Sequence, residues 1–415
     1  MQAIILAAGK SNRFYPFNGV HKSMVYLLGQ PILAHTIDGL KSAGIKDIII
    51  VVQDNRTVEN YFGNGKKRGV NINYVWQKEP TGMGDALLLA KNKIAGKFIL
   101  LGGNHVNSHI LVTELLAGRK NADAVLLVNQ RANTWDYGVV NLEDGQVAGV
   151  VEKPKKGQEP SKFCLASIYL LPLNFLPVLD QTKTHQYSFE EALNHFAKTT
   201  KVAAVKTKEE IATLKYPWDL LTVKNILIKQ MQDPRGKNVK IAKSAEIIGP
   251  VFIGNNVKIM EGARIKGPCY IGDNVTVGNN ALLRGGVDIE ENATVGSYME
   301  VKNSLIMQGA TTHGGFIGDS IIGQNCKIGT QFSTANVRID RKTVKVVVKG
   351  ETVDSMGKFL GVMMGDGVKV GLKSSTMPGV IIGSNAVIGP ATTVLQNVPE
   401  NSHYYTKFQE VVIKK

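Results

Sequence analysis

The chain has 415 residues, enough for two or three domains, and its 43% hydrophobic and 20% charged residues are typical of a folded globular protein. The three cysteines, Cys164, Cys269 and Cys326, are widely spaced, which argues against a disulfide framework and against a structural zinc site. No apolar run approaches the roughly 18 residues that a membrane span needs. Together these observations predict a cytoplasmic protein. The formal net charge of +15 favours anionic partners such as phosphorylated metabolites or coenzyme A. It also fits a basic surface that has no specific partner. The basic residues are too scattered along the sequence to favour nucleic acid as the partner.

The first half of the chain alternates predicted strands and helices. Apolar runs predict strands over 2–6, 47–52, 70–75, 98–101 and 124–128, and helical spacing predicts helices over 31–42 and 86–93. This order predicts a Rossmann-like α/β sandwich with a mostly parallel sheet, whose ligands bind at the carboxyl ends of the strands.

A third amphipathic stretch, 217–230, predicts a helix that ends at the turn cluster 233–236. We therefore place the first domain at 1–235 and the second at 236–403, followed by a C-terminal tail at 404–415.

The second half repeats an aliphatic residue at every sixth position, the signature of a β-helix whose aliphatic residues point inward. The repeat comprises Ile241, Ile247, Ile253, Ile259, Ile265, Ile271, Val277, Leu283, Ile289, Val295, Val301 and Met307. The phase breaks at His313, resumes at Ile322 and Ile328, breaks again over 331–361, and returns from Met364 to Val394. A solenoid does not need a histidine in its repeat, so we expect chemistry at the interruptions.

The loop after the first strand carries a recognisable motif. Leu6, Ala7, Ala8 and Gly9 precede Arg13 and, further on, Lys22, and the set resembles the signature loop of sugar-1-phosphate nucleotidylyltransferases. Backbone N–H groups of such a loop cradle phosphates. The resemblance implies that Arg13 holds the departing pyrophosphate and that Lys22 neutralises charge on the α-phosphate.

Later segments follow the same family's order. Gln77 and Gly82 lie in a segment that resembles the one that reads a pyrimidine base. Gly138, Glu152 and Lys153 lie in segments that resemble the sugar-binding ones, and 216–219 resembles the closing segment.

The repeat region resembles the acetyltransferase domain of bifunctional N-acetylglucosamine-1-phosphate uridylyltransferases of the archaeal type, which implies a left-handed β-helix and a homotrimer. The matching residues are His313, Phe316, Asn336, Lys342 and Lys345. The resemblance implies that His313 is the general base and that the other four form the acetyl-transfer site. Phe316 stands where the family has a tyrosine.

The family's Mg²⁺ ligands are altered in this sequence. The resemblance places Asn104 where the family has an aspartate, and Asp219 is the carboxylate near the second ligand position. Mg²⁺ prefers anionic oxygens, so this ligand set is incomplete.

Three functions stay open from the sequence. The first is a bifunctional enzyme that transfers UMP or dTMP from UTP or dTTP to a sugar-1-phosphate of the N-acetylglucosamine or glucose type and uses acetyl-CoA to acetylate an amino-sugar phosphate. The second is an enzyme with one of these activities and a degenerate second domain. The third is a non-catalytic subunit that binds nucleotide sugars.

Overall fold

The computed structural model describes residues 1–53, 56–119, 121–131, 133–143, 145–211, 213–409 and 411–413. The chain forms two compact units, each made of two stretches of sequence. Unit 1 comprises Met1–Lys10 and Pro31–Ala212, and unit 2 comprises Ser11–Gln30 and Thr213–Lys415. This division differs from the sequence-based one because segment 11–30 and the residues from 213 onward pack with the β-helix. Across the described residues, no helix combines the length and the apolar character needed to cross a bilayer.

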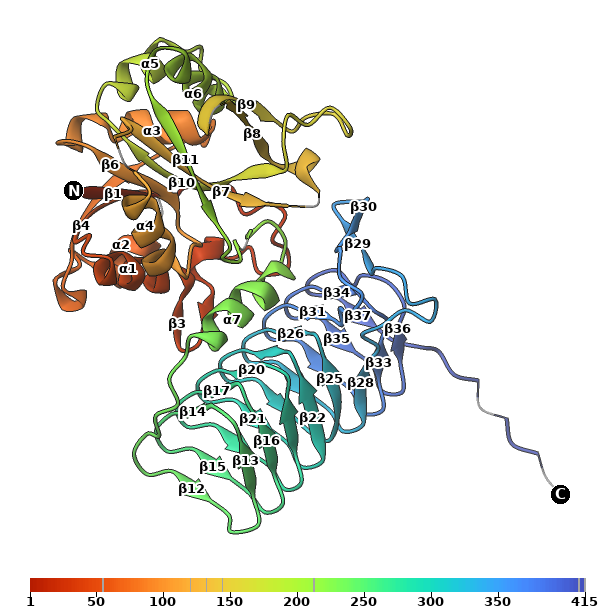
Figure 1. Ribbon diagram of the computed structural model, residues 1–415. Helices are drawn as coiled ribbons and strands as arrows, with labels where there is room; N and C mark the ends of the chain where they lie inside the picture. The colour runs from red at the N-terminus through yellow and green to blue at the C-terminus, as the bar shows by residue number, and fades with distance from the viewer. Residues whose placement is uncertain are drawn as a thin grey trace. The chain divides into compact units, whose positions relative to one another are not determined.

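Unit 1 is built on a nine-stranded sheet in the order β5-β4-β1-β6-β10-β7-β11-β9-β8 (Figure 1). Strands β1, β4, β5 and β6 are mutually parallel, and β10 runs antiparallel to both β6 and β7. The strands are β1 (Gln2–Ala7), β4 (Asp47–Val52), β5 (Asn71–Trp76), β6 (Phe98–Gly102), β7 (Ala124–Gln130), β8 (Gly138–Glu143), β9 (Gln146–Glu152), β10 (Phe163–Leu171) and β11 (Val202–Thr207). The predicted Rossmann-like α/β class is confirmed.

The central strands are apolar on both faces, so helices cover both sides of the sheet. Leu87, Phe175 and Phe189 from three helices pack into one core with Ile4 and Ile49 of the sheet. The helices are α1 (Ile32–Ser42), α2 (Thr57–Phe62), α3 (Met83–Leu89), α4 (Ser108–Ala117), α5 (Phe175–Gln181) and α6 (Ser188–Thr199), with short 3₁₀ turns at η2 (Lys66–Arg68), η3 (Lys91–Lys93) and η4 (Thr134–Asp136). The predicted helix over 86–93 lies earlier, because Gly82 begins α3.

Unit 2 is dominated by three parallel sheets whose short strands follow one another around each coil, which is the predicted left-handed β-helix (Figure 1). The first sheet contains β12 (Lys240–Ile241), β15 (Lys258–Ile259), β18 (Thr276–Val277), β21 (Thr294–Val295), β24 (Thr311–Thr312), β27 (Lys327–Ile328), β32 (Lys369–Val370), β35 (Val387–Ile388) and β37 (His403–Tyr404). The second contains β13 (Glu246–Ile248), β16 (Arg264–Lys266), β19 (Leu282–Arg284), β22 (Met299–Lys302), β25 (Gly315–Gly318), β28 (Phe332–Thr334), β33 (Ser375–Thr376) and β36 (Thr393–Val394). The third contains β14 (Val251–Ile253), β17 (Cys269–Ile271), β20 (Val287–Ile289), β23 (Leu305–Ile306), β26 (Ile321–Ile322), β31 (Met363–Met364) and β34 (Ile381–Ile382).

Four further elements belong wholly or partly to unit 2. These are η1 (Lys22–Met24), the hairpin strands β2 (Tyr26–Leu27) and β3 (Gln30–Pro31), and helix α7 (Asp219–Lys229). A second hairpin, β29 (Lys345–Val348) with β30 (Glu351–Asp354), lies in the segment 331–361, where the sequence predicted that the repeat is interrupted.

Asparagines in the left-handed conformation turn one corner of the β-helix. Asn238, Asn256, Asn274 and Asn292 all have φ between 57° and 61°, a conformation that asparagine tolerates better than most residues. Each side-chain amide donates to the next, with N···O distances of 3.2, 3.0 and 3.1 Å. This ladder satisfies polar groups along the corner.

The inward aliphatic ladder slips earlier than the sequence predicts. In the register of the third sheet Ile289 pairs with Ile306, not with Met307, so this coil has 17 residues instead of 18. The next coils are shorter still, and Val301 pairs with Ile317. The assignment of Met307 to the inward ladder was therefore wrong, because the shortening begins before His313.

The outward side of the third sheet is unusually apolar. The residues that lie in register along it are Phe252, Tyr270, Asp288, Leu305, Ile321, Met363 and Ile381. From Asp288 onward all of them are buried, whereas the corresponding positions of the first sheet include the exposed lysines Lys240, Lys258, Lys327 and Lys369. Segment 11–30 and α7 lie on this apolar side, as the contacts below show.

Candidate active sites

The nucleotide loop starts at the carboxyl end of the central strand β1. The carbonyl of Leu6 accepts a hydrogen bond from the N–H of Gly103 at 3.2 Å, and Ala7 and Ala8 are buried. Gly9 is exposed, and no heavy atom lies within 4 Å of the position that a Cβ would take there. The backbone at Gly9 is thus open to a ligand, as the predicted phosphate contact requires.

Gln77 is held in one orientation by an aspartate. It is 2% exposed, and its Nε2 donates to Asp85 Oδ2 at 2.7 Å. Because the carboxylate can only accept, the amide nitrogen must face Asp85, and Oε1 is the atom left to accept a hydrogen bond. The predicted base-reading residue is therefore an acceptor.

Gly82 is required by a close backbone approach. It precedes α3 with φ +147°, a conformation that residues with side chains rarely adopt, and a Cβ would lie 3.0 Å from the carbonyl oxygen of Gln186. This brings the start of α3 against the segment before α6.

Two predicted sugar-binding residues face each other across an antiparallel strand pair. Gly138 of β8 pairs with Glu152 of β9, and a Cβ on Gly138 would lie 2.8 Å from the Glu152 carboxylate. Next to it, Lys153 has φ +45° and donates from Nζ to the hydroxyl of Tyr187 at 3.1 Å. The glycine thus leaves room for a carboxylate, and a cation lies beside it.

A further carboxylate, Glu190 of α6, belongs to this group. Its pKa is raised to about 7, mainly by burial and in part by the charge of Glu152, while His185 and Lys153 oppose the shift. Its Oε2 is buried and has no hydrogen-bond partner among the described residues. A buried acceptor next to Glu152 is suited to sugar hydroxyls.

A hollow of about 880 Å³ opens beside the same strands. It is lined by Gln130, Arg131, Thr134, Glu159, Ser161 and Lys162. The guanidinium of Arg131 lies 4.2 Å from the ring centre of Tyr137, the residue before Gly138. The hollow therefore adjoins the predicted sugar-binding segment.

Arg13 and Lys22 lie in unit 2, where both contact the stretch that leads into α7. Lys22 Nζ donates to the carbonyl of Leu214 at 2.7 Å, and the guanidinium of Arg13 lies 5.6 Å from the ring centre of Tyr216. Burial lowers the pKa of Lys22, and the nearby charge of Arg13 lowers it further. Two cations close enough to repel each other suit a ligand with several negative charges.

In the β-helix, the structure brings Phe316 and Asn336 together above Gly318. A Cβ on Gly318 would lie 2.6 Å from the Phe316 ring and 2.8 Å from Asn336 Nδ2. His313 follows β24, its side chain is exposed, and its N–H donates to Ile328 at 3.1 Å. Lys342 and Lys345 are also exposed, in the loop before β29 and at its first residue.

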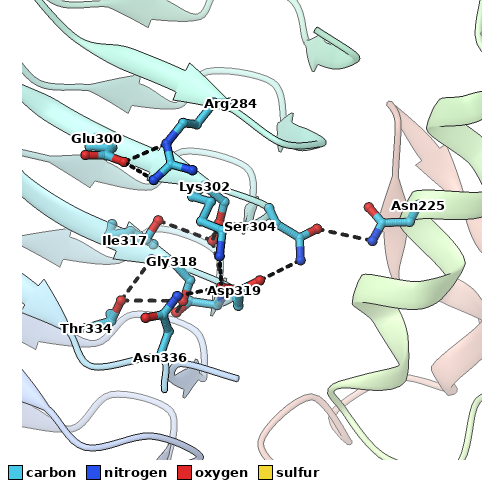
Figure 2. A network of polar contacts seen from close by, with 12 residues as sticks. Asn225, Arg284, Glu300, Lys302, Ser304, Ile317, Gly318, Asp319, Thr334 and Asn336 are labelled. Carbon is cyan, nitrogen blue, oxygen red and sulfur yellow. Dashed lines mark hydrogen bonds and ion pairs between the residues drawn. The ribbon is translucent and has the colours of Figure 1, made fainter. Parts of the chain in front are cut away.

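Asp319 links this group to α7 (Figure 2). Its Oδ2 accepts from Asn336 Nδ2 at 2.6 Å and from Lys302 Nζ at 3.0 Å, and its Oδ1 accepts from Asn303 Nδ2 at 2.7 Å. Asn303 Oδ1 in turn accepts from Asn225 of α7 at 3.1 Å. The buried carboxylate fixes the orientation of the Asn336 amide and leaves Asn336 Oδ1 as the acceptor.

Comparison with known proteins identifies the family. A nucleotidyl transferase family model matches residues 2–221, more than half of the chain, and models of the GMPPB C-terminal domain and of the hexapeptide repeat of succinyl-transferase match residues 265–357 and 361–394. The bifunctional protein GlmU of Methanococcus maripaludis (strain C7) is 40% identical over 422 residues, which cover 100% of both chains. The chain belongs to the bifunctional GlmU-type family of nucleotidylyltransferase/acetyltransferases.

Other GlmU-type relatives agree over the whole length. The GlmU of Methanocaldococcus jannaschii is 34% identical and covers 100% of both chains. A bifunctional sugar-1-phosphate nucleotidylyltransferase/acetyltransferase of Sulfurisphaera tokodaii is 31% identical over 96% of this chain and 98% of that protein. The chain is therefore an enzyme of nucleotide-sugar synthesis with a nucleotidyltransferase domain and a hexapeptide-repeat acyltransferase domain.

The GlmU-type resemblance predicted Mg²⁺ at Asn104 and Asp219, but these residues do not fit a protein-held ion. Asn104 brings no charge. Asp219 Oδ2 accepts the N–H groups of Lys215 and Tyr216 at 2.5 and 2.9 Å, and burial raises the pKa of the carboxyl. Nowhere in the described part of the chain do three His, Cys, Asp or Glu side chains group to hold a metal. We therefore assign no catalytic step to an ion bound by these two side chains.

Sequence reasoning missed Asp85, Glu190 and Asp319. Each acts on a predicted site residue through a hydrogen bond or a charge, and none stands at a diagnostic spacing from its partner. Asp319 lies three residues after Phe316 in the sequence, but only the fold shows that it faces Asn336.

Proposed function

We propose that the first domain transfers UMP or dTMP from UTP or dTTP to a sugar-1-phosphate of the N-acetylglucosamine or glucose type and releases pyrophosphate. The observation that carries the proposal is the fixed orientation of Gln77, whose amide nitrogen is held by Asp85. Uracil and thymine both present an N3–H donor to the remaining amide oxygen, whereas cytosine presents an acceptor there. An acceptor held in this way selects the first two bases.

The phosphate chemistry falls to the two cations of segment 11–30. A phosphate oxygen of the sugar-1-phosphate attacks the α-phosphorus, and the bond to the pyrophosphate oxygen breaks. The nucleophile is already anionic, so no general base is needed. Arg13 holds the leaving pyrophosphate, and Lys22 stabilises charge on the α-phosphate, with the backbone of Leu6–Gly9 near the triphosphate.

The sugar is bound by the group around Gly138. Glu152 accepts hydrogen bonds from sugar hydroxyls, Lys153 donates to the sugar or its phosphate, and Glu190 adds a second acceptor. These roles are supported by the facing positions of Gly138 and Glu152 and by the shared electrostatics of the three charged side chains.

For the β-helix we propose acetyl transfer from acetyl-CoA to the amine of an amino-sugar phosphate. His313 takes the proton from the amine, which attacks the thioester carbonyl, and the coenzyme A thiolate leaves. Asn336 Oδ1 accepts a hydrogen bond from the amine, Phe316 packs beside it, and Lys342 and Lys345 hold the phosphate. The contact between Asn336 and Asp319 supports the role of Asn336 as an acceptor.

The assembly we propose is a homotrimer. Tyr298, whose carbonyl accepts from Gly315 in the loop of His313, is 72% exposed, and a large exposed aromatic side chain beside a site is suited to a subunit contact. Sedimentation equilibrium should give three times the chain mass, and a monomer at micromolar concentration would contradict the proposal.

The test of the nucleotidyl assignment is pyrophosphate release with Mg²⁺ and UTP, dTTP or CTP against a panel of sugar-1-phosphates. We expect release with UTP or dTTP and a kcat/KM for CTP lower by at least about a hundredfold. Equal use of CTP would contradict the role of Gln77. The Arg13→Ala variant serves as the matched control, since it should lose turnover with every nucleotide.

A further inference from the structure

The turn between β2 and β3 is hydrogen-bonded to the β-helix. Leu28 and Gly29 form its two-residue tip with φ values of +50° and +81°. Such a conformation is uncommon for leucine and persists where the surroundings impose it. The N–H of Leu28 donates to Asp288 Oδ2, and the N–H of Gly29 donates to Glu290 Oε1, both at 3.1 Å.

The two acceptors are carboxylates that lie among buried, mostly aliphatic side chains. Asp288 stands in the outward row of the third sheet, which continues with Leu305, Ile321 and Met363. Glu290 is the residue that directly follows the same strand, β20. Both are fully buried, and burial raises the pKa of Asp288 to about 7 and that of Glu290 well above its usual value. Burying carboxyl groups is costly unless they are hydrogen-bonded. Both accept hydrogen bonds from the hairpin tip, Gln308 also donates to Glu290 at 3.4 Å, and the charge of the buried Lys224 on α7 acts on Asp288.

Segment 11–30 is held at its other end as well. A Cβ on Gly383 would overlap the hydroxyl of Tyr15, and a Cβ on Gly365 would lie 3.0 Å from Pro16. The segment therefore touches the β-helix two residues after Arg13 and six residues after Lys22. Lys22 therefore lies between two points that contact the β-helix, at Tyr15–Pro16 and at Leu28–Gly29, and Arg13 lies two residues before the first of them.

We propose that the β-helix positions the phosphate-binding segment of the nucleotidyl site, with Asp288 and Glu290 as positioning residues for Arg13 and Lys22. The acetyltransferase scaffold thus takes part in nucleotidyl transfer without touching its substrates. This inference rests on the proposed role of Arg13 and Lys22 in binding the triphosphate.

Glu290 offers a clean test in the full-length protein. Glu290→Met keeps the size of the side chain but removes the acceptor, whereas Glu290→Gln keeps an oxygen for the N–H of Gly29. We expect Glu290→Met to lower kcat/KM for pyrophosphate release by about tenfold or more, with a higher KM for the nucleotide, and Glu290→Gln to restore most of it. Acetyl transfer by the same preparations should change less than about twofold, because His313 and Asn336 are not altered.

Glu246→Met is the matched control, since Glu246 lies on the second sheet and pairs with Arg264 at 2.5 Å. It should leave pyrophosphate release unchanged. The inference is overturned if Glu290→Met releases pyrophosphate like the wild type, or if it lowers both activities by the same factor, which would indicate general damage to the β-helix.

A second readout separates this inference from the proposed function. If the wild type releases no pyrophosphate, the nucleotidyl assignment fails, and hydrogen exchange over 11–30 together with the Kd for UTP then decides the inference. Faster exchange and weaker UTP binding in Glu290→Met, both reversed in Glu290→Gln, would support positioning. Unchanged exchange and unchanged binding would overturn it.

Discussion

The side-chain amide of Asn336 donates a 2.6 Å hydrogen bond to Asp319, a buried carboxylate that is also paired with Lys302 at 3.0 Å. A carboxylate cannot donate when ionised, so this contact decides which end of the Asn336 amide points away. The family resemblance identified Asn336, whereas the role of Asp319 is visible only in the folded structure.

Asp319→Asn should weaken binding of the amino sugar. With an amide at 319 the Asn336 side chain can rotate and present Nδ2, which repels an amine donor. We expect the KM for the amino-sugar phosphate to rise about tenfold while the KM for acetyl-CoA changes little. Steady-state kinetics with each substrate varied in turn measures this. A parallel rise in both KM values would instead indicate a structural role, which urea denaturation of the variant would confirm.

Asp85→Asn should relax the choice of pyrimidine. An asparagine at 85 can donate to Gln77 Oε1 and favour the flipped amide, whose Nε2 suits the acceptor N3 of cytosine. The ratio of kcat/KM for UTP over CTP should fall by about tenfold or more. Asp85→Glu keeps the carboxylate and serves as the control. An unchanged ratio in Asp85→Asn would show that Gln77 does not read the base.

Phe316→Tyr should raise acetyl transfer. The ring lies beside Gly318 and Asn336, so a hydroxyl at its end would add a polar group at the site where the resembling family has one. One hydrogen bond of ordinary strength corresponds to a gain of about threefold to tenfold in kcat/KM. Acetyl-CoA consumption with an amino-sugar phosphate measures the change, and a loss of activity would mean that the hydroxyl has no partner there.

Asn104→Asp should strengthen the dependence on Mg²⁺. A carboxylate at 104 adds the charge that the present side chain lacks, and Mg²⁺ prefers anionic oxygens. The Mg²⁺ concentration that gives half-maximal pyrophosphate release should fall by about tenfold. Asn60→Asp, an exposed change on α2, is the control for the added charge alone. If both variants respond alike, position 104 has no special place in metal binding.

His105 should make unit 1 sensitive to acid. Burial lowers the pKa of His105 from 6.5 to about 4, so the folded protein keeps it neutral at pH values where the unfolded chain already binds a proton. Between pH 6.5 and 4 the unfolded state therefore gains protons, and the free energy of unfolding falls by about 3 kcal/mol. His105→Gln removes this contribution. Urea denaturation at several pH values should show a smaller loss of stability on acidification in the variant, and parallel profiles would contradict the assignment.

The sequence predicted those features that depend on local pattern. The apolar runs of β1, β4, β6 and β7 and the period of six are properties of neighbouring residues, and both produced the right architecture. The change of register at Met307 was not predicted, because a shortened coil changes the register without changing the apolar character of the neighbouring residues.

Contacts between distant parts of the chain were out of reach. Leu28 and Asp288 are 260 positions apart, and Asn336 and Asp319 lie on different coils of the β-helix. The site residues that belong to a family motif could be named from the sequence. The acidic residues that orient them could not, because no fixed spacing in the sequence links such an acid to its partner.

The apolar outward row of the third sheet bears on how this protein can be divided. A fragment that begins at residue 236 would lack both segment 11–30 and α7, and Leu305, Ile321, Met363 and Ile381 would then face water. A row of large aliphatic side chains along parallel strands promotes aggregation. Moving the β-helix to another protein would therefore require segment 11–30 and α7 to be moved with it, because both belong to the same compact unit.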